Sequence, residues 1–561
     1  MRFAVFAVGI PLVVGVPWDV VSGKQRAVKE VKRWIFAPGN ANGMNFVWST
    51  DDLKPKAGSA GQDSVKGKPV VEAPPAAPPA AAPAAPPQNP QPVARPTPAL
   101  LAKPIEEAPP VSGPKPVVEG PPAVPGDGER LGQGQESKFA HPRTIKVAAL
   151  PNNEDERQRL NQNLVWADFH PTGFYVGARQ VLKVKVSGVR DNGPQPEILV
   201  GTPNLIDPAR PFQDMRAMLV PSGPLGNGDH DVENDVDGII YIRYVYGRDQ
   251  EAPPPVSVTL EGDAAQPIPL FRQGVTTDEE WVDMLRETKV PFAEHVGERV
   301  ILTGLKRDAL VYAERGQKQE ELLNRYKAII AAQDAISGLR ADAADARDRP
   351  SPLRPMVVQT NRMVYANAWS WRAAIGQSTI SDIWWQPELE RSWKIWHELG
   401  HHRQHSPTWS WEAVAEVTVN IYTLAARRLV PEIPSSETEH GTVEEWNKAK
   451  RYLEQGRQFK DFDRADLIVM LVMFEQLREV FGDGFYHELH RRSRAEPVQY
   501  EGEADKKHHF MALAANVTGH DLTPFFETWG LRPEGRTVEE MARQPQKMGW
   551  DFSQQPVFGG E

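Results

Sequence analysis

The sequence predicts an α+β protein of several domains, in which an N-terminal β-sandwich-like domain is followed by a mainly helical domain. Three observations support this order. Short runs of alternating apolar and polar residues, separated by Gly, Asn, Asp and Pro, recur between residues 144 and 258. After Thr276 the apolar residues recur with a helical period instead. A Pro- and Ala-rich stretch over 68–126 separates both domains from the N-terminus.

Composition narrows the chemistry that the chain can perform. Its 561 residues are enough for two or three domains with cores of their own. A net charge of -10 provides no basic surface for phosphates, so we expect no nucleic-acid partner. The chain has no cysteine, which excludes disulfides and thiolate metal sites. Only His, Asp and Glu side chains remain as strong metal ligands.

The N-terminus resembles an export signal. A positive start and an apolar run of about fifteen residues suit a signal peptide or an uncleaved anchor over residues 1–23. We therefore expect a secreted, periplasmic or cell-surface bacterial protein, associated with the membrane at its N-terminus if the segment is retained. Residues 24–67 carry no clear pattern, and 68–126 predict an extended, disordered linker.

The two folded domains are predicted over residues 140–275 and 276–540, with a C-terminal tail over 541–561. The clearest strands of the first domain are 181–189, 196–202 and 237–247. The clearest elements of the second are helices at 278–290, 318–339 and 464–482, and one short strand at 355–365. The apolar run LIVMLVMF in the last helix is too short to span a membrane and predicts a buried helix.

The most informative stretch is HELGHHRQHSPTWSWEAVAE, which begins at His397. We predict a single helix over 388–406, ended by Pro407. His397 and His401 are four residues apart, so both imidazoles lie on one face at the separation that two ligands of one zinc ion need. Glu398 lies beside the first ligand, where its carboxylate can act as a general base toward water.

A catalytic zinc site usually takes three protein ligands and keeps a fourth position open. Pro407 stands where a third histidine of the HExxHxxGxxH pattern would be, which excludes that pattern. The remaining solution is a glutamate on the next predicted helix, over 409–429. Glu412 and Glu416 are four apart on one face, so spacing alone does not choose between them. The pattern predicts a zincin-type metallopeptidase domain with one Zn²⁺ per chain.

HELGHHRQ, then Trp409 and Trp411, then EVTVNIYTL resemble the signature of the enhancin-like zinc metallopeptidases. This gluzincin-type family includes viral enhancins and bacterial mucin-degrading O-glycopeptidases. The resemblance extends from about Ala167 to Leu531 through ADFHPTGFYVGARQVLKVKVSG, VPFAEHVGERVILTGL and HDLTPFFETWGL. It departs at NAWSWRAAIGQST, residues 367–379, where the family has a Gly-Tyr-Pro-type segment.

The resemblance implies a role for each residue of the motif. His397, His401 and Glu416 would bind zinc, Glu398 would be the general base, and Glu412 would be no ligand. It also implies an O-glycosylated or mucin-type protein as substrate, because such family members cut beside glycosylated Ser or Thr.

Further residues are candidates for oxyanion or substrate contacts. They are Tyr365, Trp409, Trp411 and Tyr422. Aromatic faces stack on sugars as well as packing in cores. We expect His402 and His405 to lie at the surface or in the substrate cleft.

Two other functions remain open at this point. The chain could be a zinc endopeptidase for unglycosylated protein or cell-wall peptide. It could also be a catalytically silent surface protein that binds glycans. The sequence does not specify an oligomeric state.

Overall fold

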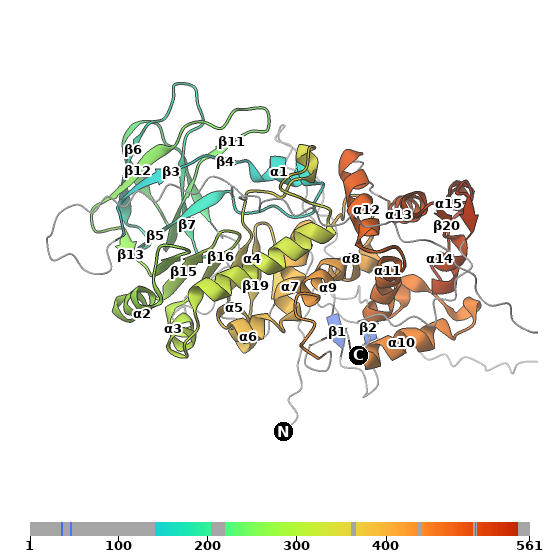
Figure 1. Cartoon of the computed structure of the whole chain (residues 1–561). Helices are drawn as coiled ribbons and strands as arrows, with labels where there is room; N and C mark the ends of the chain where they lie inside the picture. Colours follow the sequence, from blue (N-terminus) through green and yellow to red (C-terminus); the bar gives the residue numbers. More distant parts are fainter. Residues whose placement is uncertain are drawn as a thin grey trace, which may run out of the picture.

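The computed structural model describes most of the chain from residue 141 to residue 547, together with one strand pair nearer the N-terminus (Figure 1). The described residues are 35–37, 45–47, 141–203, 219–360, 366–434, 440, 442–496, 500 and 502–547. β1 (Ile35–Ala37) and β2 (Asn45–Val47) pair in antiparallel fashion. The predicted signal or anchor, the linker and the last part of the predicted tail lie outside the described residues.

Two antiparallel sheets build the N-terminal domain, with the orders β3-β12-β6-β9 and β13-β5-β10-β7-β8. In β6 every second side chain of VLKVKVS is buried, as expected for a strand with one face toward a core. The strands are β3 (Thr144–Val147), β5 (Phe169–Val176), β6 (Val181–Ser187), β7 (Glu197–Gly201), β8 (Val220–Pro224), β9 (Gly228–Glu233), β10 (Gly238–Arg243), β12 (Val256–Glu261) and β13 (Gln266–Pro267).

The two sheets share one apolar core. Val184 of β6 and Val258 of β12 come from the first sheet, and Val200 of β7 and Ile240 of β10 come from the second. All four side chains are almost fully buried. One short helix, α1 (Asn153–Leu160), and a two-residue parallel pair, β4 (Leu150–Pro151) with β11 (Val245–Tyr246), complete the domain.

The second domain begins with a mixed sheet of six strands in the order β14-β15-β16-β17-β19-β18. Its strands are β14 (Leu270–Arg272), β15 (Phe292–Val296), β16 (Ile301–Leu305), β17 (Met356–Gln359), β18 (Ala366–Trp369) and β19 (Arg372–Ile375). The sequence predicted only a short strand around β17. The central strands have both faces buried, so they lack the alternation that identifies a half-exposed strand.

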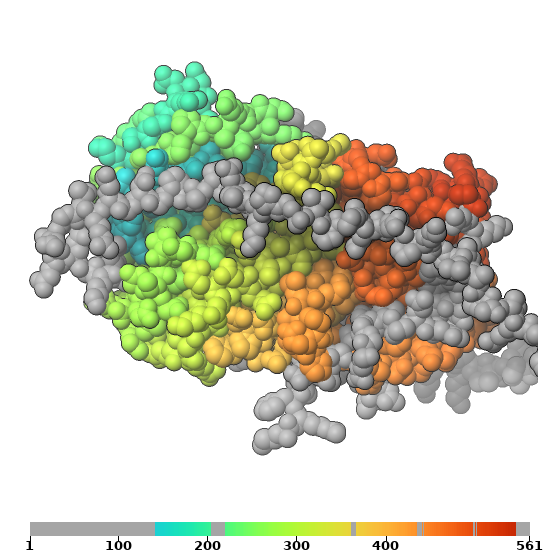
Figure 2. Space-filling view, in the orientation of Figure 1, coloured from blue at the N-terminus to red at the C-terminus, as the bar shows by residue number. Residues whose placement is uncertain are grey.

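This sheet packs between the N-terminal domain and a layer of helices. On one face, Phe292 and Met356 join Phe169 and Tyr241 of the five-stranded sheet in one apolar cluster. On the other face, Leu302 and its neighbours pack against helices, among them α4 and α7. The described residues from 141 to 547 therefore form one continuous body from the N-terminal sheets to the C-terminal helices (Figure 2).

The rest of the second domain is mainly helical. The longer helices are α2 (Asp278–Glu287), α3 (Lys306–Glu314), α4 (Gln319–Ile336), α7 (Trp393–Gly400), α9 (Asn420–Arg427), α10 (Val443–Leu453), α11 (Leu467–Phe481), α12 (Asp483–Ala495) and α13 (Glu503–Thr518). The shorter elements are α5 (Ser381–Trp384), α6 (Gln386–Leu389), α8 (Ala415–Thr418), α14 (Thr523–Trp529), α15 (Gly535–Met541) and the strand pair β20 (His520–Asp521) with β21 (Gln546–Lys547).

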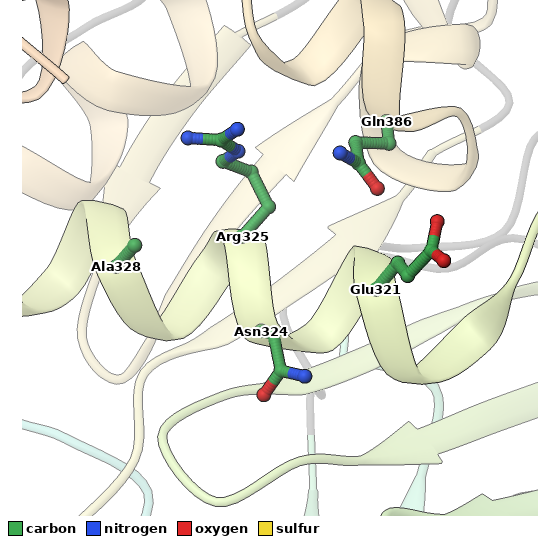
Figure 3. A pocket seen from close by; sticks show the side chains of 5 residues that line it. All are labelled: Glu321, Asn324, Arg325, Ala328 and Gln386. Carbon is green, nitrogen blue, oxygen red and sulfur yellow. The ribbon is translucent and has the colours of Figure 1, made fainter. Parts of the chain in front are cut away.

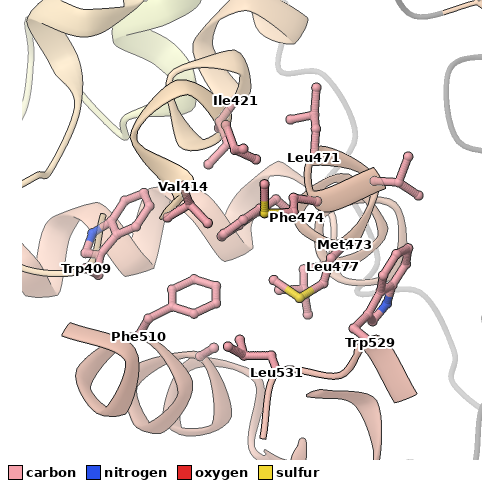
Figure 4. Close-up of a cluster of buried hydrophobic side chains, with 14 of the residues drawn as sticks. Trp409, Val414, Ile421, Leu471, Met473, Phe474, Leu477, Phe510, Trp529 and Leu531 are labelled. Carbon is pink, nitrogen blue, oxygen red and sulfur yellow. The ribbon is translucent and has the colours of Figure 1, made fainter. Parts of the chain in front are cut away.

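Helix α11 lies inside the C-terminal helical core, as its apolar run predicts. Phe474 of α11 packs against Phe510 of α13, and Trp529 of α14 belongs to the same apolar cluster (Figure 4). Among the residues that the structure describes, no helix has both the length and the apolar character that crossing a membrane requires.

The helix predicted over 388–406 is instead broken into α6, α7 and a 3-10 turn over His401–Arg403. Ser392 leaves the helical conformation, and its side chain accepts a hydrogen bond from the Ile395 N–H, which starts α7 afresh. Leu389, Trp393 and Trp396 are buried. The helix predicted over 409–429 is likewise split, into a 3-10 turn (Glu412–Val414), α8 and α9.

Candidate metal centre

The HExxH segment lies where α7 approaches the start of α9 very closely. Gly400 makes this approach possible, because a Cβ atom at this position would lie 2.9 Å from the backbone oxygen of Val419. The approach brings His397 of α7, and His401 in the 3-10 turn that follows it, against the segment that carries Glu416.

Three ligand atoms converge at this contact. Nε2 of His397 lies 3.0 Å from Oε2 of Glu416, and Nε2 of His401 lies 3.5 Å from the same oxygen. The potential ligand atoms of the three residues all lie within 4.8 Å of one another, and no other such group of three occurs among the described residues. Glu412 is exposed and outside the group; its backbone N–H bonds to Glu503. Of the two glutamates, the structure therefore brings only Glu416 to the histidines.

Both histidines are oriented by side-chain amides. Nδ1 of His397 donates to Oδ1 of Asn420 at 2.8 Å, and Nδ1 of His401 donates to Oε1 of Gln404 at 3.1 Å. Each Nδ1 therefore donates its proton, and in the neutral ring the lone pair that can bind a metal ion is left on Nε2, the nitrogen that faces Glu416. The three residues thus offer two imidazole nitrogens and a carboxylate oxygen to one point.

The centre is open on the side of the glutamate. The side chains of His397 and His401 are 16% and 13% exposed, whereas that of Glu416 is 47% exposed. Glu398 is buried. Burial raises the pKa of the Glu398 carboxyl above its usual value, and the neighbouring His397 and His401 act in the opposite direction.

Two family descriptions match the chain in sequence order. One is the N-terminal domain of M60-like peptidases, over residues 151–259, and the other is peptidase M60, enhancin and enhancin-like, over residues 264–530. The chain belongs to the M60 family of enhancin-like peptidases. This confirms the family that the motif indicated. All three residues of the centre lie in the second match.

Relatives of this M60 chain are known from sequence and from structure. TRPM8 channel-associated factor 3 of Rattus norvegicus is 25% identical over 332 residues, which cover 58% of this chain and 34% of that protein. The chain thus spans about a third of the length of the curated relatives that it matches.

Two solved structures illustrate the shared fold. A functionally unknown conserved protein from Bacillus anthracis str. Ames is 25% identical, with a TM-score of 0.62 over 73% of this chain and 80% of that one. The M60 catalytic domain of Clostridium perfringens ZmpC, solved in complex with the sialyl T antigen, has a TM-score of 0.59 at 17% identity, over 73% of this chain and 81% of that one.

Three of the four residues predicted to contact the oxyanion or the substrate lie away from the metal centre. Trp409 is buried in the C-terminal helical core (Figure 4). Trp411 is buried in the same core, and its indole donates to Asp463. Tyr422 is fully buried and donates to the backbone oxygen of Arg403. In these positions none of the three is accessible to a substrate. The fourth candidate, Tyr365, lies outside the described residues.

The prediction for His402 and His405 was wrong, because both are fully buried. Nδ1 of His402 donates to the backbone oxygen of Val165 in the N-terminal domain. The ring of His405 stacks on Trp409. The break after α7 turns this part of the chain inward, which a continuous helix would not do.

Two features near the centre were not predicted. Asn420 and Gln404 orient the histidines; Asn420 stands four residues after Glu416, so helical spacing could have suggested it. The second feature is the edge strand β18, which packs against α7 and carries Trp369, 40% exposed. The guanidinium of Arg372 lies 5.8 Å from the centre of this indole.

A separate depression lies between α4 and the start of α6 (Figure 3). Glu321, Asn324, Arg325 and Ala328 of α4 line it together with Gln386 at the start of α6. None of the residues of the metal centre lines it, so it forms no part of that site.

Proposed function

We propose that this chain is a zinc-dependent endopeptidase that cleaves O-glycosylated, mucin-type proteins. One observation carries the proposal: His397, His401 and Glu416 direct three ligand atoms to one point beside the buried carboxylate of Glu398. The arrangement matches what metal-assisted hydrolysis of a peptide bond requires.

The donor set suits zinc. Two imidazole nitrogens and one carboxylate oxygen are a common catalytic set, and they leave a fourth position for water or substrate. When bound, zinc supplies Lewis-acid polarisation of the scissile carbonyl and lowers the pKa of water. Glu398 takes the proton of the attacking water and delivers it to the leaving amine. Asn420 and Gln404 hold His397 and His401 in the tautomer that this set needs.

Two observations support a glycosylated substrate. The ZmpC catalytic domain, similar in fold, was solved with the sialyl T antigen. In this chain, the exposed indole of Trp369 beside α7 offers an aromatic face on which a sugar ring can stack. The apolar run over 1–23 supports the further proposal that the protein is exported and meets its substrate outside the cytoplasm or at the cell surface.

The test compares a defined O-glycopeptide with its deglycosylated twin, with products identified by mass spectrometry. We expect cleavage of the glycopeptide alone. We expect Glu398→Gln to abolish cleavage while zinc remains bound. Equal cleavage of both peptides would replace the proposal with a general endopeptidase. Full activity of Glu398→Gln would refute the assigned base.

A binding protein without catalysis is the second candidate. The names of the curated relatives favour it, because they are called channel-associated factors. The complete set of His397, Glu398, His401 and Glu416 argues for catalysis. Binding of the glycopeptide by the zinc-loaded protein, with no cleavage under any condition, would establish the second candidate.

A further inference from the structure

Gln404 occupies an unusual position beside the metal centre. It is the first residue after the 3-10 turn over His401–Arg403, and its backbone there is extended, with φ -70° and ψ 134°. The side chain is 1% exposed. A buried amide loses free energy unless its donors and acceptor are bonded, so its partners matter.

Every polar atom of the Gln404 side chain bonds to the elements that carry the ligands. Oε1 accepts from Nδ1 of His401. Nε2 lies 2.7 Å from Oγ1 of Thr418, 2.5 Å from the backbone oxygen of Ala415 and 3.2 Å from Oγ of Ser410. The carbonyl of Ala415 can only accept, which fixes the amide nitrogen on that side and the amide oxygen toward His401.

Asn420 makes the corresponding connection for the other histidine. Its Oδ1 accepts from His397, and its Nδ2 donates to the backbone oxygen of Glu416 at 2.9 Å. Each histidine is thus joined through one neutral amide to the short segment 415–420. The two amides close a ring of contacts that sets the position of Glu416 relative to both histidines.

The backbone of Gln404 is held in turn by the N-terminal domain. The N–H of Asn163 donates to the backbone oxygen of Gln404 at 3.0 Å. Two residues earlier, Nδ1 of His402 donates to the backbone oxygen of Val165 at 2.9 Å. The turn that follows the second histidine is therefore fixed from outside its own domain.

We infer that Gln404 is a positioning residue of the metal centre: its amide orients His401 and holds the segment that carries Glu416, while its backbone connects both to the N-terminal domain. The inference rests on the proposed zinc site. A positioning role differs from a purely structural one, because losing the Gln404 amide then changes the geometry and strength of metal binding and not only the stability of the fold.

Two variants of the full chain remove the contact in different ways. Gln404→Met keeps the length of the side chain and removes its hydrogen bonds. Gln404→Asn keeps the amide but withdraws it by one carbon, and it serves if the first variant does not fold. Gln404→Glu retains an oxygen that can accept from His401. As a matched control, Gln476→Met changes a glutamine that is also 1% exposed but bonds to Trp529 in the helical core.

Metal binding is measured by chelator competition for zinc and by the visible absorption spectrum of the cobalt-substituted protein. We expect Gln404→Met or Gln404→Asn to weaken zinc binding about 10- to 100-fold and to change the cobalt spectrum. We expect Gln404→Glu to weaken zinc binding as well, because it keeps the oxygen that accepts from His401 but sets a second acceptor against the backbone oxygen of Ala415. Gln476→Met should lower the melting temperature and leave both metal readouts unchanged.

The outcomes separate this inference from the proposed function. If the wild type binds zinc and a folded Gln404→Met or Gln404→Asn binds it equally tightly with an unchanged cobalt spectrum, the positioning role is wrong and the proposed function stands. If Gln404→Glu binds zinc as tightly as the wild type, the role of the amide nitrogen in holding the segment with Glu416 is wrong. If the wild type itself binds no zinc, the proposed function fails first.

Discussion

At the scale of single residues, Glu412 and Glu416 stand one helical turn apart but lie in different surroundings. Glu416 meets both histidines, whereas Glu412 lies apart from them and its backbone N–H bonds to Glu503. We expect Glu416→Ala to lose zinc at concentrations that saturate the wild type, because one of three ligands is gone. Glu412→Ala should retain a full equivalent of zinc. Metal analysis after dialysis measures both, and equal zinc contents in the two variants would contradict the assignment.

Of two tryptophans near the motif, we expect Trp409 to contribute to the stability of the fold and Trp369 to contribute to substrate binding. Trp409 is fully buried, so Trp409→Ala should lower the free energy of unfolding by about 3 to 5 kcal/mol. Trp369 is 40% exposed on the edge strand, so Trp369→Ala should change stability little and reduce cleavage of a glycopeptide. Urea unfolding and peptide digestion measure the two effects. A large loss of stability in Trp369→Ala would contradict the assigned surface role.

These residues also mark what the sequence could predict about the site. His397, Glu398 and His401 follow from helical spacing, which holds over one turn of α7. Residue type could not place Trp409 or Trp411, because aromatic side chains suit a core as well as a cleft. Their burial depends on the 3-10 turns that break the two helices, and these turns are fixed by contacts with distant residues.

At the scale of elements, the close approach of α7 and α9 depends on Gly400. A methyl group there would meet the backbone oxygen of Val419 at 2.9 Å and its side chain at 3.1 Å. We expect Gly400→Ala to separate the two elements, to destabilise the fold by about 1 to 3 kcal/mol and to weaken zinc binding. Urea unfolding and chelator competition measure these changes.

Gly484 of α12 provides the matched control, because a Cβ at this position would meet nothing within 4 Å. Gly484→Ala should be neutral or raise stability slightly through the better helix propensity of Ala, with zinc binding unchanged. If Gly400→Ala behaves in the same way, the close approach does not control the geometry of the site.

At the scale of the whole molecule, the sequence did not predict the six-stranded sheet that forms the layer between the N-terminal sheets and the helices. The six-stranded sheet buries one face against the N-terminal domain and the other against helices. Strands covered on both faces show no alternation, and several of these strands are only four or five residues long. Such short apolar runs do not distinguish a strand from part of a buried helix, and their pairing depends on partners far away in sequence.

This layer contains a buried acid that couples the two domains. Glu294 of β15 is fully buried, and its Oε1 accepts from the hydroxyl of Tyr241 in the N-terminal domain at 2.6 Å and from Thr303 of β16 at 2.9 Å. Burial raises the pKa of Glu294 from 4.5 to about 7, although both hydrogen bonds and the nearby Arg272 act to lower it. The folded protein therefore retains this proton at a pH where the unfolded chain has lost it.

The sign of the pH effect follows from this difference. A raised pKa favours the folded state below pH 4.5, and the advantage is lost as pH rises to about 7. The loss is roughly 3 kcal/mol, from about 1.4 kcal/mol for each pKa unit. Glu294→Gln keeps an accepting oxygen for Tyr241 and Thr303 and has no proton to lose. We therefore expect the variant to gain stability relative to the wild type as pH rises from 4.5 to 8. Urea unfolding of both proteins at several pH values measures this change. If the difference in free energy of unfolding between the two proteins stays constant from pH 4.5 to 8, the buried Glu294 does not lose a proton in this range.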